Sequence, residues 1–193
     1  DLLIGTQMMA KGYHFPRLTL VGVIDADLGL AGGDPRAAER TFQLLQQVSG
    51  RSGRAEEKGT VYLQTTNPQH PVMKALIDGD RDAFMKAELK ERQQYHLPPF
   101  GRLATITIAG TKKDQVIQIA KMIAAHAPQR KGFRILGPAP APYALLRGKT
   151  RYRLMIQGAR NAPLSKIIDA WLAPLSIPRA IRLHIDIDPY SFL

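Results

Sequence analysis

A chain of 193 residues with 45% hydrophobic content is long enough for one large or two small globular domains. Cysteine is absent, which excludes disulfides and thiolate metal sites, and no apolar run approaches the ~20 residues of a membrane span, so we expect a cytoplasmic protein without a membrane partner. The net charge of +11 lies entirely from Tyr95 onward, where fifteen Lys and Arg stand against four Asp.

Residues 1–66 alternate short apolar runs with a helical stretch, a rhythm typical of a parallel sheet. The apolar runs at Leu2–Gly5, 18–24 and 59–65 predict three strands, the second buried on both faces because it is continuously apolar. Three strands are too few for an independent nucleotide-binding domain. We therefore expect further strands upstream, in a longer protein of which this is the C-terminal piece.

The segment between the second and third strands predicts a helix over about 36–49. Asp34-Pro35 is typical of an N-cap followed by proline at the first helical position. Phe42, Leu45 and Val48 form the apolar stripe of this helix.

Residues 71–99 predict a helical connector in two pieces, broken near Asp78-Gly79-Asp80. The motif Leu97-Pro98-Pro99-Phe100 ends the second piece, since proline restricts the residue before it to extended geometry. We place the domain boundary there, between a first domain at 1–70 and a basic C-terminal domain at 100–193.

The C-terminal domain alternates strands and helices in a βαββαβ order. The first predicted strand carries apolar residues at 104, 106 and 108 and threonines at 105 and 107, as a sheet with one covered face should. Two helices on one side of a four-stranded antiparallel sheet is the ferredoxin-like plan, a small α/β sandwich. The predicted elements are strands at 103–109, 133–136, 151–157 and 179–187 and helices at 114–127 and 163–173.

Two arginines, Arg51 and Arg54, each follow a glycine directly after the predicted helix, in the run Gln47-Val-Ser-Gly50-Arg51-Ser-Gly53-Arg54. A guanidinium group can hydrogen-bond two phosphoryl oxygens at once, and glycines allow the backbone to approach a ligand closely. The alternative is a helix that ends in glycine and carries cations at its negative end.

A second polar segment, Gly5-Thr-Gln-Met-Met-Ala-Lys-Gly-Tyr-His-Phe-Pro16, follows the first apolar run. Together the two segments resemble the last two conserved motifs of superfamily 2 helicases. The amino-acid sequence of this second segment is similar to the corresponding motif of the primosomal protein N-prime (PriA) family of replication-restart DNA helicases. The resemblance continues more loosely through Leu97–Phe100, Leu136-Gly137-Pro138 and Asp186–Pro189.

The resemblance implies that Arg51 and Arg54 close over ATP bound on a partner lobe of a RecA-like pair, with Arg54 on the γ-phosphate. Gln47 lies one helical turn before Arg51 and would orient the nucleotide. The residues implied to contact the nucleotide are Gly5, Thr6, Gly50 and Arg54.

The loop after the first strand is implied to couple the nucleotide to the DNA backbone through Thr6, Gln7, Lys11 and His14. The alternative for this loop is a polar turn, and for His14 a histidine without a titrating role. Asp25 and Asp27 follow the second strand, but the family's metal-binding acids lie in its other lobe, so we expect these two carboxylates to cap loops or meet arginines.

The chain contains no phosphate-loop motif and no acidic magnesium motif. We therefore expect ATP and Mg²⁺ to be cofactors of the full-length protein, zinc to belong only to an upstream region, and this piece alone to be inactive as an ATPase. No metal site is assigned to the residues present.

The basic half predicts a polyanionic partner, for which nucleic acid is the first candidate and an acidic protein segment the second. The alternative is a basic surface without a dedicated partner. Its main cluster is Arg147, Lys149, Arg151, Tyr152 and Arg153. The cations would follow a phosphate backbone while Tyr152 or Tyr143 stacks on a base. Strand alternation equally allows Tyr152 to be buried in the core.

Arg160 and Lys166 flank the start of the second helix, whose N-terminal dipole favours anions. The resemblance makes this edge a candidate for the acidic tail of single-stranded DNA-binding protein. The whole pattern thus predicts part of an ATP-dependent helicase that unwinds forked DNA, binds single-stranded DNA and other primosome proteins, and restarts replication. The rivals are a non-enzymatic nucleic-acid-binding module and another superfamily 2 translocase.

Overall fold

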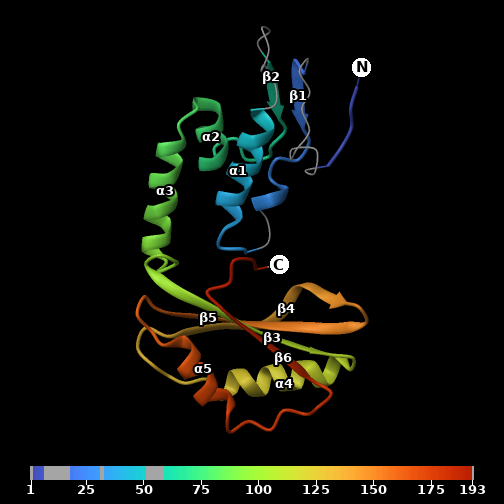
Figure 1. Cartoon of the computed structure of the whole chain (residues 1–193), viewed down its shortest axis with the longest axis vertical. Coiled ribbons are helices and arrows are strands. Elements are labelled where there is room, and N and C mark those ends of the chain that lie inside the picture. The colour runs from blue at the N-terminus through green and yellow to red at the C-terminus, as the bar shows by residue number, and fades with distance from the viewer. Residues whose placement is uncertain (1, 7–17, 31–32, 51–58, 193) are drawn as a thin grey trace. The chain divides into compact units, whose positions relative to one another are not determined.

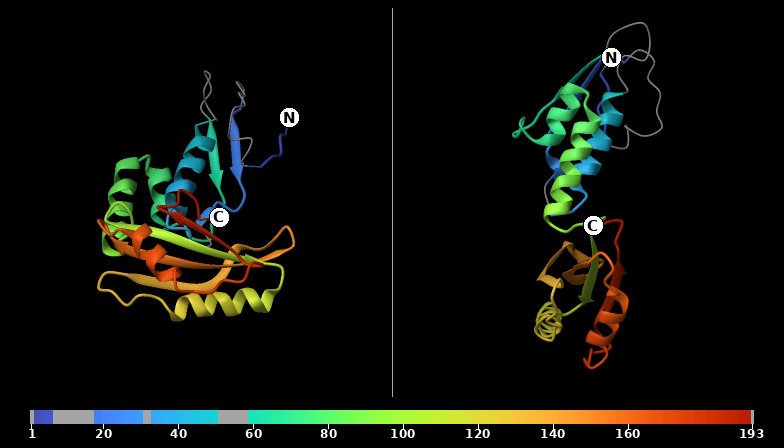
Figure 2. Two further views of the ribbon diagram at one scale, coloured as in Figure 1. Left: turned by 60° about the horizontal axis from the view of Figure 1, so that its bottom comes forward. Right: turned by 90° about the vertical axis from the view of Figure 1, so that its left-hand side faces the viewer.

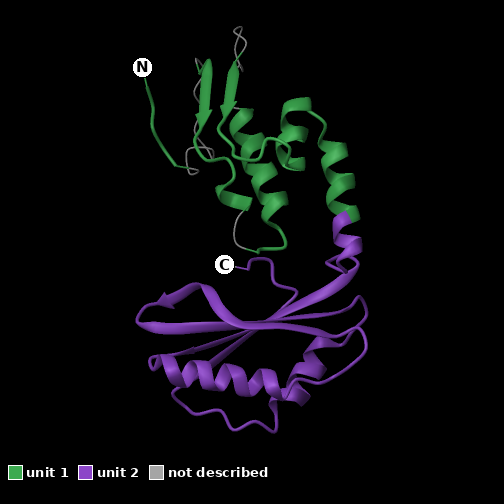
Figure 3. Cartoon of the chain, turned by 180° about the vertical axis from the view of Figure 1, so that it is seen from behind, with its two compact units in different colours: residues 1–90 green, residues 91–193 purple. Residues whose placement is uncertain are grey.

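The structure is a computed structural model with two compact units, residues 1–90 and 91–193 (Figure 3). It describes residues 2–6, 18–30, 33–50 and 59–192. None of the helices in this described part is both long and apolar enough to cross a bilayer.

Unit 1 contains a parallel strand pair joined through a helix. β1 (Leu20–Val23) pairs with β2 (Thr60–Leu63) in the register Leu20 to Thr60 through Val23 to Leu63. The short 3-10 helix η2 (Leu28–Leu30) and the helix α1 (Ala37–Ser49) lie between the two strands in the chain (Figure 1). The predicted βαβ rhythm is confirmed for this pair.

Two further helices complete unit 1, α2 (Pro71–Asp78) and the first part of α3 (Arg81–Gln94). Gly79 separates them at φ +68°, a left-handed geometry that glycine adopts without strain. The core of the unit joins α1 to both, and the rings of Phe42 and Phe84 stack with centroids 4.4 Å apart. Its buried residues are Ala26, Phe42, Leu45, Val72, Met73, Ala75 and Phe84.

Three predictions for unit 1 are wrong. Leu2–Gly5 forms no strand, because a strand needs a hydrogen-bonded neighbour and β1 and β2 pair only with each other among the described residues. β1 is not buried on both faces, and the side chain of Leu20 is 57% exposed, since a two-stranded sheet offers little cover. Asp34 is not the N-cap of α1.

The helix α1 instead begins two residues after Pro35, with Arg36 at the N-cap. Asp34 stabilises the turn before the helix, where its carboxylate accepts from the Arg36 amide at 2.8 Å and from the Arg40 guanidinium at 2.9 Å. The aspartate therefore stabilises the start of α1 from two residues before the N-cap.

Unit 2 holds a four-stranded antiparallel sheet in the order β4-β5-β3-β6. The strands are β3 (Gly101–Gly110), β4 (Arg134–Leu146), β5 (Lys149–Ala159) and β6 (Arg182–Ile187). Together with its helices the unit follows the predicted βαββαβ order.

One face of this sheet is covered by α4 (Lys113–Ala125) and α5 (Leu164–Leu172), as Figures 1 and 2 show. The even-numbered positions of β3 and β5 supply the sheet side of this core, which includes Ile106 and the paired Leu154. The indole Nε1 of Trp171 donates to the carbonyl of Ile123 at 3.1 Å, so it also ties α5 to α4.

The opposite face of the sheet is also shielded along β3, against the prediction of a single covered face. Thr105 and Thr107 point away from the helices, yet both are buried. The residues after β6 lie on this side of the sheet (Figure 1), and Phe192 is only 3% exposed. The alternation along β3 therefore shows which way the side chains point but not whether they contact solvent.

β4 is much longer than the predicted 133–136, and it continues through Pro138, Pro140 and Pro142. Proline removes a ladder donor, which disfavours it in a central strand. β4 is an edge strand, which tolerates prolines and bulges, and its register with β5 shifts between Leu136 and Ala139 and between Pro140 and Leu145.

Candidate nucleic-acid interface

The helicase-like motif residues in unit 1 are described only in part. Gly5, Thr6, Gln47 and Gly50 are exposed, while Gln7, Lys11, His14, Arg51 and Arg54 lie outside the described residues. The predicted roles of all nine remain predictions.

Gly50 bears on the two interpretations of the arginine motif. Its amide donates to the carbonyl of Gln46 at 3.0 Å, but its φ is −69°, a value that any residue adopts. A Cβ at this position would come no closer than 3.4 Å to a neighbour. The end of α1 therefore gives no conformational reason for a glycine at 50, and both interpretations of the arginine motif stay open.

Asp27 follows β1 and caps the turn after β2. Its carboxylate accepts from the Thr65 hydroxyl at 2.6 Å, the Thr66 amide at 2.6 Å and the Thr66 hydroxyl at 2.8 Å. These hydrogen bonds, first the one from Thr65, lower the pKa of Asp27 below its ordinary value. The predicted loop-capping role is confirmed for Asp27. The described residues contain no group of three or more side chains placed to hold a metal ion.

The main basic cluster lies on the hairpin formed by β4 and β5. Arg147 and Gly148 form its two-residue turn with φ +50° and +72°, the pattern of a type I′ turn. This turn matches the twist of the strands, so the hairpin presents Arg147 at its tip and Lys149 directly across from Leu146.

Strand alternation divides the rest of the cluster between two faces. Tyr152 pairs with Ile108 and packs against the core on the helical side, which favours the burial alternative for its ring. Arg153 points to the other side, where its guanidinium donates to the Phe192 carbonyl at 2.5 Å and lies 6.0 Å from the Phe192 ring centroid. Lys149 and Arg151 share that face with Arg153.

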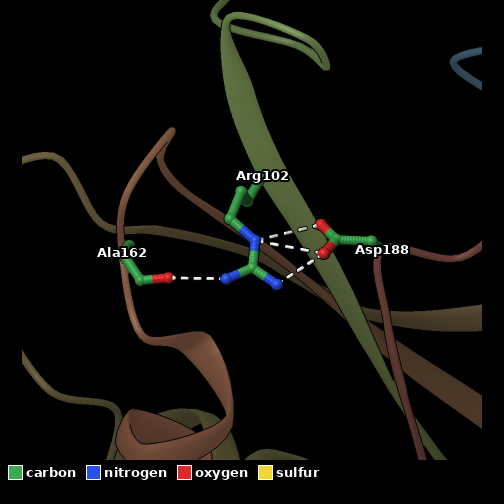
Figure 4. Close-up of polar contacts among 3 residues, drawn as sticks. All are labelled: Arg102, Ala162 and Asp188. Atoms are coloured by element: carbon green, nitrogen blue, oxygen red, sulfur yellow. Dashed lines mark hydrogen bonds and ion pairs between the residues drawn. The ribbon is translucent and has the colours of Figure 1, made fainter.

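Arg160 and Lys166 are both exposed, on the loop before α5 and on α5 itself. The loop is held by Arg102 at the start of β3 (Figure 4). Arg102 donates to the Asp188 carboxylate from Nε at 3.0 Å and from one terminal nitrogen at 2.5 Å, and to the Ala162 carbonyl from the other at 3.0 Å. The bonds to Asp188 raise the pKa of the guanidinium further.

The sequence did not predict this three-way contact, nor the contact of Arg153 with Phe192. A buried polar side chain was also missed. Gln157, on β5, donates from Nε2 to the carbonyls of Tyr95 and His96 at 2.5 and 3.0 Å. Its position directly after the apolar run Leu154–Ile156 was the available signal.

These features define an α/β protein whose C-terminal unit carries a basic hairpin. The chain belongs to the family described as the primosomal protein N C-terminal domain, whose model matches residues 93–190. It is similar along its whole length to proteins named replication restart protein PriA. One from Rickettsia felis is 47% identical over 192 residues, and one from Bacillus subtilis is 36% identical over 199 residues.

A relative of the same name from Synechocystis is 40% identical over 193 residues and matches 99% of the chain. The chain spans 30% of the length of the Rickettsia felis protein, 25% of the Bacillus subtilis protein and 23% of the Synechocystis protein. The resemblance to the PriA family drawn from the motifs is confirmed.

Proposed function

We propose that the chain is the C-terminal part of an ATP-dependent DNA helicase that unwinds forked DNA and restarts replication by primosome assembly. The observation that carries the proposal is the pair of helicase-like segments, Gly5–Pro16 and Gln47–Arg54, in a chain whose relatives are named for replication restart.

Unit 1 would be the C-terminal part of a RecA-like lobe. The parallel pairing of β1 with β2 through α1 supports this, because such lobes are built from βαβ units. Arg51 and Arg54 would neutralise charge on the phosphates of ATP bound elsewhere in the full-length protein, with Gln47, Gly50, Gly5 and Thr6 beside them. Mg²⁺ and zinc would be held by residues outside this chain.

Unit 2 would be a ferredoxin-like sandwich that binds DNA. Counted along the unit, the sheet order is 4-1-3-2 with both helices on one face, which supports this plan. The phosphate contacts would come from Arg147, Lys149 and Arg151. The two other residues of the predicted DNA-binding cluster are Tyr152 and Arg153.

Arg160 and Lys166 would receive the acidic tail of single-stranded DNA-binding protein. The support is that both cations are exposed and that Arg102 holds the loop between them. Other primosome proteins and forked and single-stranded DNA are the remaining proposed partners, in the cytoplasm.

The test is ATP hydrolysis by the full-length parent protein carrying Arg54→Ala. Because an arginine finger typically supplies ~10³–10⁵ in rate, DNA-stimulated hydrolysis should be abolished while nucleotide binding stays mostly intact. Arg51→Ala should reduce DNA-stimulated ATP hydrolysis by a comparable factor. Arg81→Ala, an exposed arginine at the start of α3, is the matched control and should leave the rate unchanged. An Arg54 variant within a factor of about ten of wild type contradicts the assignment.

A further inference from the structure

The tip of the β4–β5 hairpin exposes apolar side chains beside its cations. Tyr143 is 54% exposed, Leu145 71% and Leu146 45%. Polar side chains are more common than large apolar ones at a solvated turn. None of these three residues contributes to the core of unit 2.

The geometry of the tip places these side chains on both sides of the ribbon. Leu146 pairs with Lys149 and Leu145 pairs with Thr150, and directly paired residues share a face. Leu146 therefore lies on the face of Lys149 and Arg151, and Leu145 on the other. Tyr143 lies in a bulge where Ala141 to Ala144 stand opposite the single residue Arg151.

The bulge and the turn together give the tip a defined shape. The type I′ turn closes the strands tightly, and an edge bulge increases the local twist and turns the strand aside. The apolar residues are thus presented by a paired hairpin rather than by a loose loop. A presented apolar tip is suited to insertion into or stacking on a partner.

The charge around the tip selects the kind of partner. No Asp or Glu occurs between Asp114 and Asp169, while the same stretch contains ten cations. A partner of this hairpin must therefore be anionic and must also offer apolar surface. The cations are Lys121, Arg130, Lys131, Arg134, Arg147, Lys149, Arg151, Arg153, Arg160 and Lys166.

Single-stranded nucleic acid has both properties along its whole length. Lys149 and Arg151 are two residues apart on one face, about 6.6 Å along the strand, which is of the order of the distance between successive phosphates of an extended single strand. Unpaired bases expose apolar faces that aromatic and apolar side chains cover, whereas a duplex hides those faces in its stack. Phosphate binding alone would leave Tyr143, Leu145 and Leu146 without a role.

We propose that Tyr143, Leu145 and Leu146 form a base-contacting site that makes the hairpin prefer single-stranded over duplex DNA. This inference rests on the proposed DNA-binding function of unit 2 and adds the site that distinguishes the two forms. The cations supply phosphate attraction to either form, and the apolar tip contacts bases only where they are unpaired.

The experiment uses the whole 193-residue chain with fluorescein-labelled dT20 and a labelled 20-base-pair duplex, followed by anisotropy. The double variant Tyr143→Ala/Leu145→Ser should lose roughly tenfold or more in affinity for dT20, since a stacked base contributes about that much, and less than about twofold for the duplex. Its salt slope on dT20 should equal that of wild type because the phosphate contacts remain.

Ile185→Ser is the control, because Ile185 is an exposed apolar residue on the opposite edge of the same sheet. It should bind both DNAs as wild type does. Trp171 is the single tryptophan and is buried in unit 2, so its emission verifies that each variant is folded.

Three results overturn the proposal. Equal losses on dT20 and duplex, or no loss on either, remove the base-contacting role while leaving DNA binding by unit 2 intact. Absence of wild-type binding to both DNAs at low salt removes the proposed DNA function as well. A tip variant that keeps dT20 binding but loses a labelled Glu-rich peptide assigns the tip to an acidic protein partner instead.

Discussion

The guanidinium of Arg153 on β5 holds the carbonyl of Phe192, near the end of the chain, at 2.5 Å. The two residues are 39 positions apart, and their contact fixes the segment after β6 to the side of the sheet opposite α4 and α5. It divides the basic hairpin into cations with different surroundings, because Lys149 and Arg151 lie on the same strand nearer its tip.

Salt dependence should identify the phosphate-binding cations. If about three or four phosphates are contacted, binding of a single strand by the chain should have a log–log salt slope near −2 to −3. Lys149→Ala/Arg151→Ala should flatten that slope by roughly one unit and weaken different sequences equally, since phosphate contacts carry no base information. Lys112→Ala/Lys113→Ala, at the start of α4, is the control pair. An unchanged slope in the first pair would move unit 2 to an acidic-partner role.

Arg153→Ala should act on stability more than on DNA binding. Loss of the hydrogen bond to Phe192 and of the cation–π contact should lower the free energy of unfolding of unit 2 by about 1–2 kcal/mol. Urea unfolding followed by Trp171 emission measures this. Lys149→Ala should change the same free energy by less than about 0.5 kcal/mol. The distinction is lost if both variants unfold at the same urea concentration.

Two glycines with positive φ should respond differently to alanine. Gly137 has φ +99°, and a Cβ there would lie 2.8 Å from the carbonyl oxygen of Arg153, so Gly137→Ala should destabilise unit 2 by roughly 2–4 kcal/mol. Gly132 has φ +75° with nothing within 4 Å of its Cβ position, so Gly132→Ala should cost only about 1 kcal/mol of backbone strain. Thermal unfolding of the two variants side by side tests the difference, and equal costs would contradict the role of the Arg153 carbonyl.

The lowered pKa of Asp27 makes a pH-dependent contribution to unit 1. The folded-state pKa is depressed, so the stabilisation is present above the ordinary carboxyl range and is lost as the pH falls through the folded value. A carboxyl carbon NMR titration should give Asp27 a midpoint below that of an unperturbed aspartate. Thr65→Val should move the midpoint upward because the first of the three hydrogen bonds is gone. A midpoint that stays in place would show that the Thr65 hydroxyl is not the main cause.

Arg102→Lys should loosen the loop before α5. A lysine keeps the charge but cannot hold the Asp188 carboxylate and the Ala162 carbonyl from one planar fork. The amides of Ala162 and Leu164, which are hydrogen-bonded within that loop, should exchange with deuterium several-fold faster. Arg182→Lys on β6 serves as the comparison and should leave these amides unaffected. Unchanged exchange in Arg102→Lys would mean that Pro163 and the core hold the loop without the arginine.

The sequence predicted the order of elements in unit 2 and the order β1, α1, β2 in unit 1, because strand alternation and helical stripes are local properties of the chain. The alternation of Ile106 with Thr105 and Thr107 identified β3 and its helical side correctly. It did not reveal that the threonine side is shielded, since burial there depends on where the residues after β6 run.

The contacts that were missed are those between residues far apart in the sequence. Nothing local in the sequence distinguishes Arg102 from the other cations or indicates that Asp188 and Ala162 come to it. The strand predicted at 133–136 was too short, because β4 continues through three prolines that only an edge strand tolerates. The same bulged edge produced the exposed tip.

The sheet order of unit 2 also determines how the unit can fold. Among its described strands only β4 and β5 are joined by a tight turn, whereas β3, at 101–110, pairs with strands at 149–159 and 182–187. A hairpin closes in about 1–10 μs, and distant pairings must first overcome the entropy of closing long loops. We therefore expect the hairpin to form early and the docking of β3 between β5 and β6 to limit the folding rate.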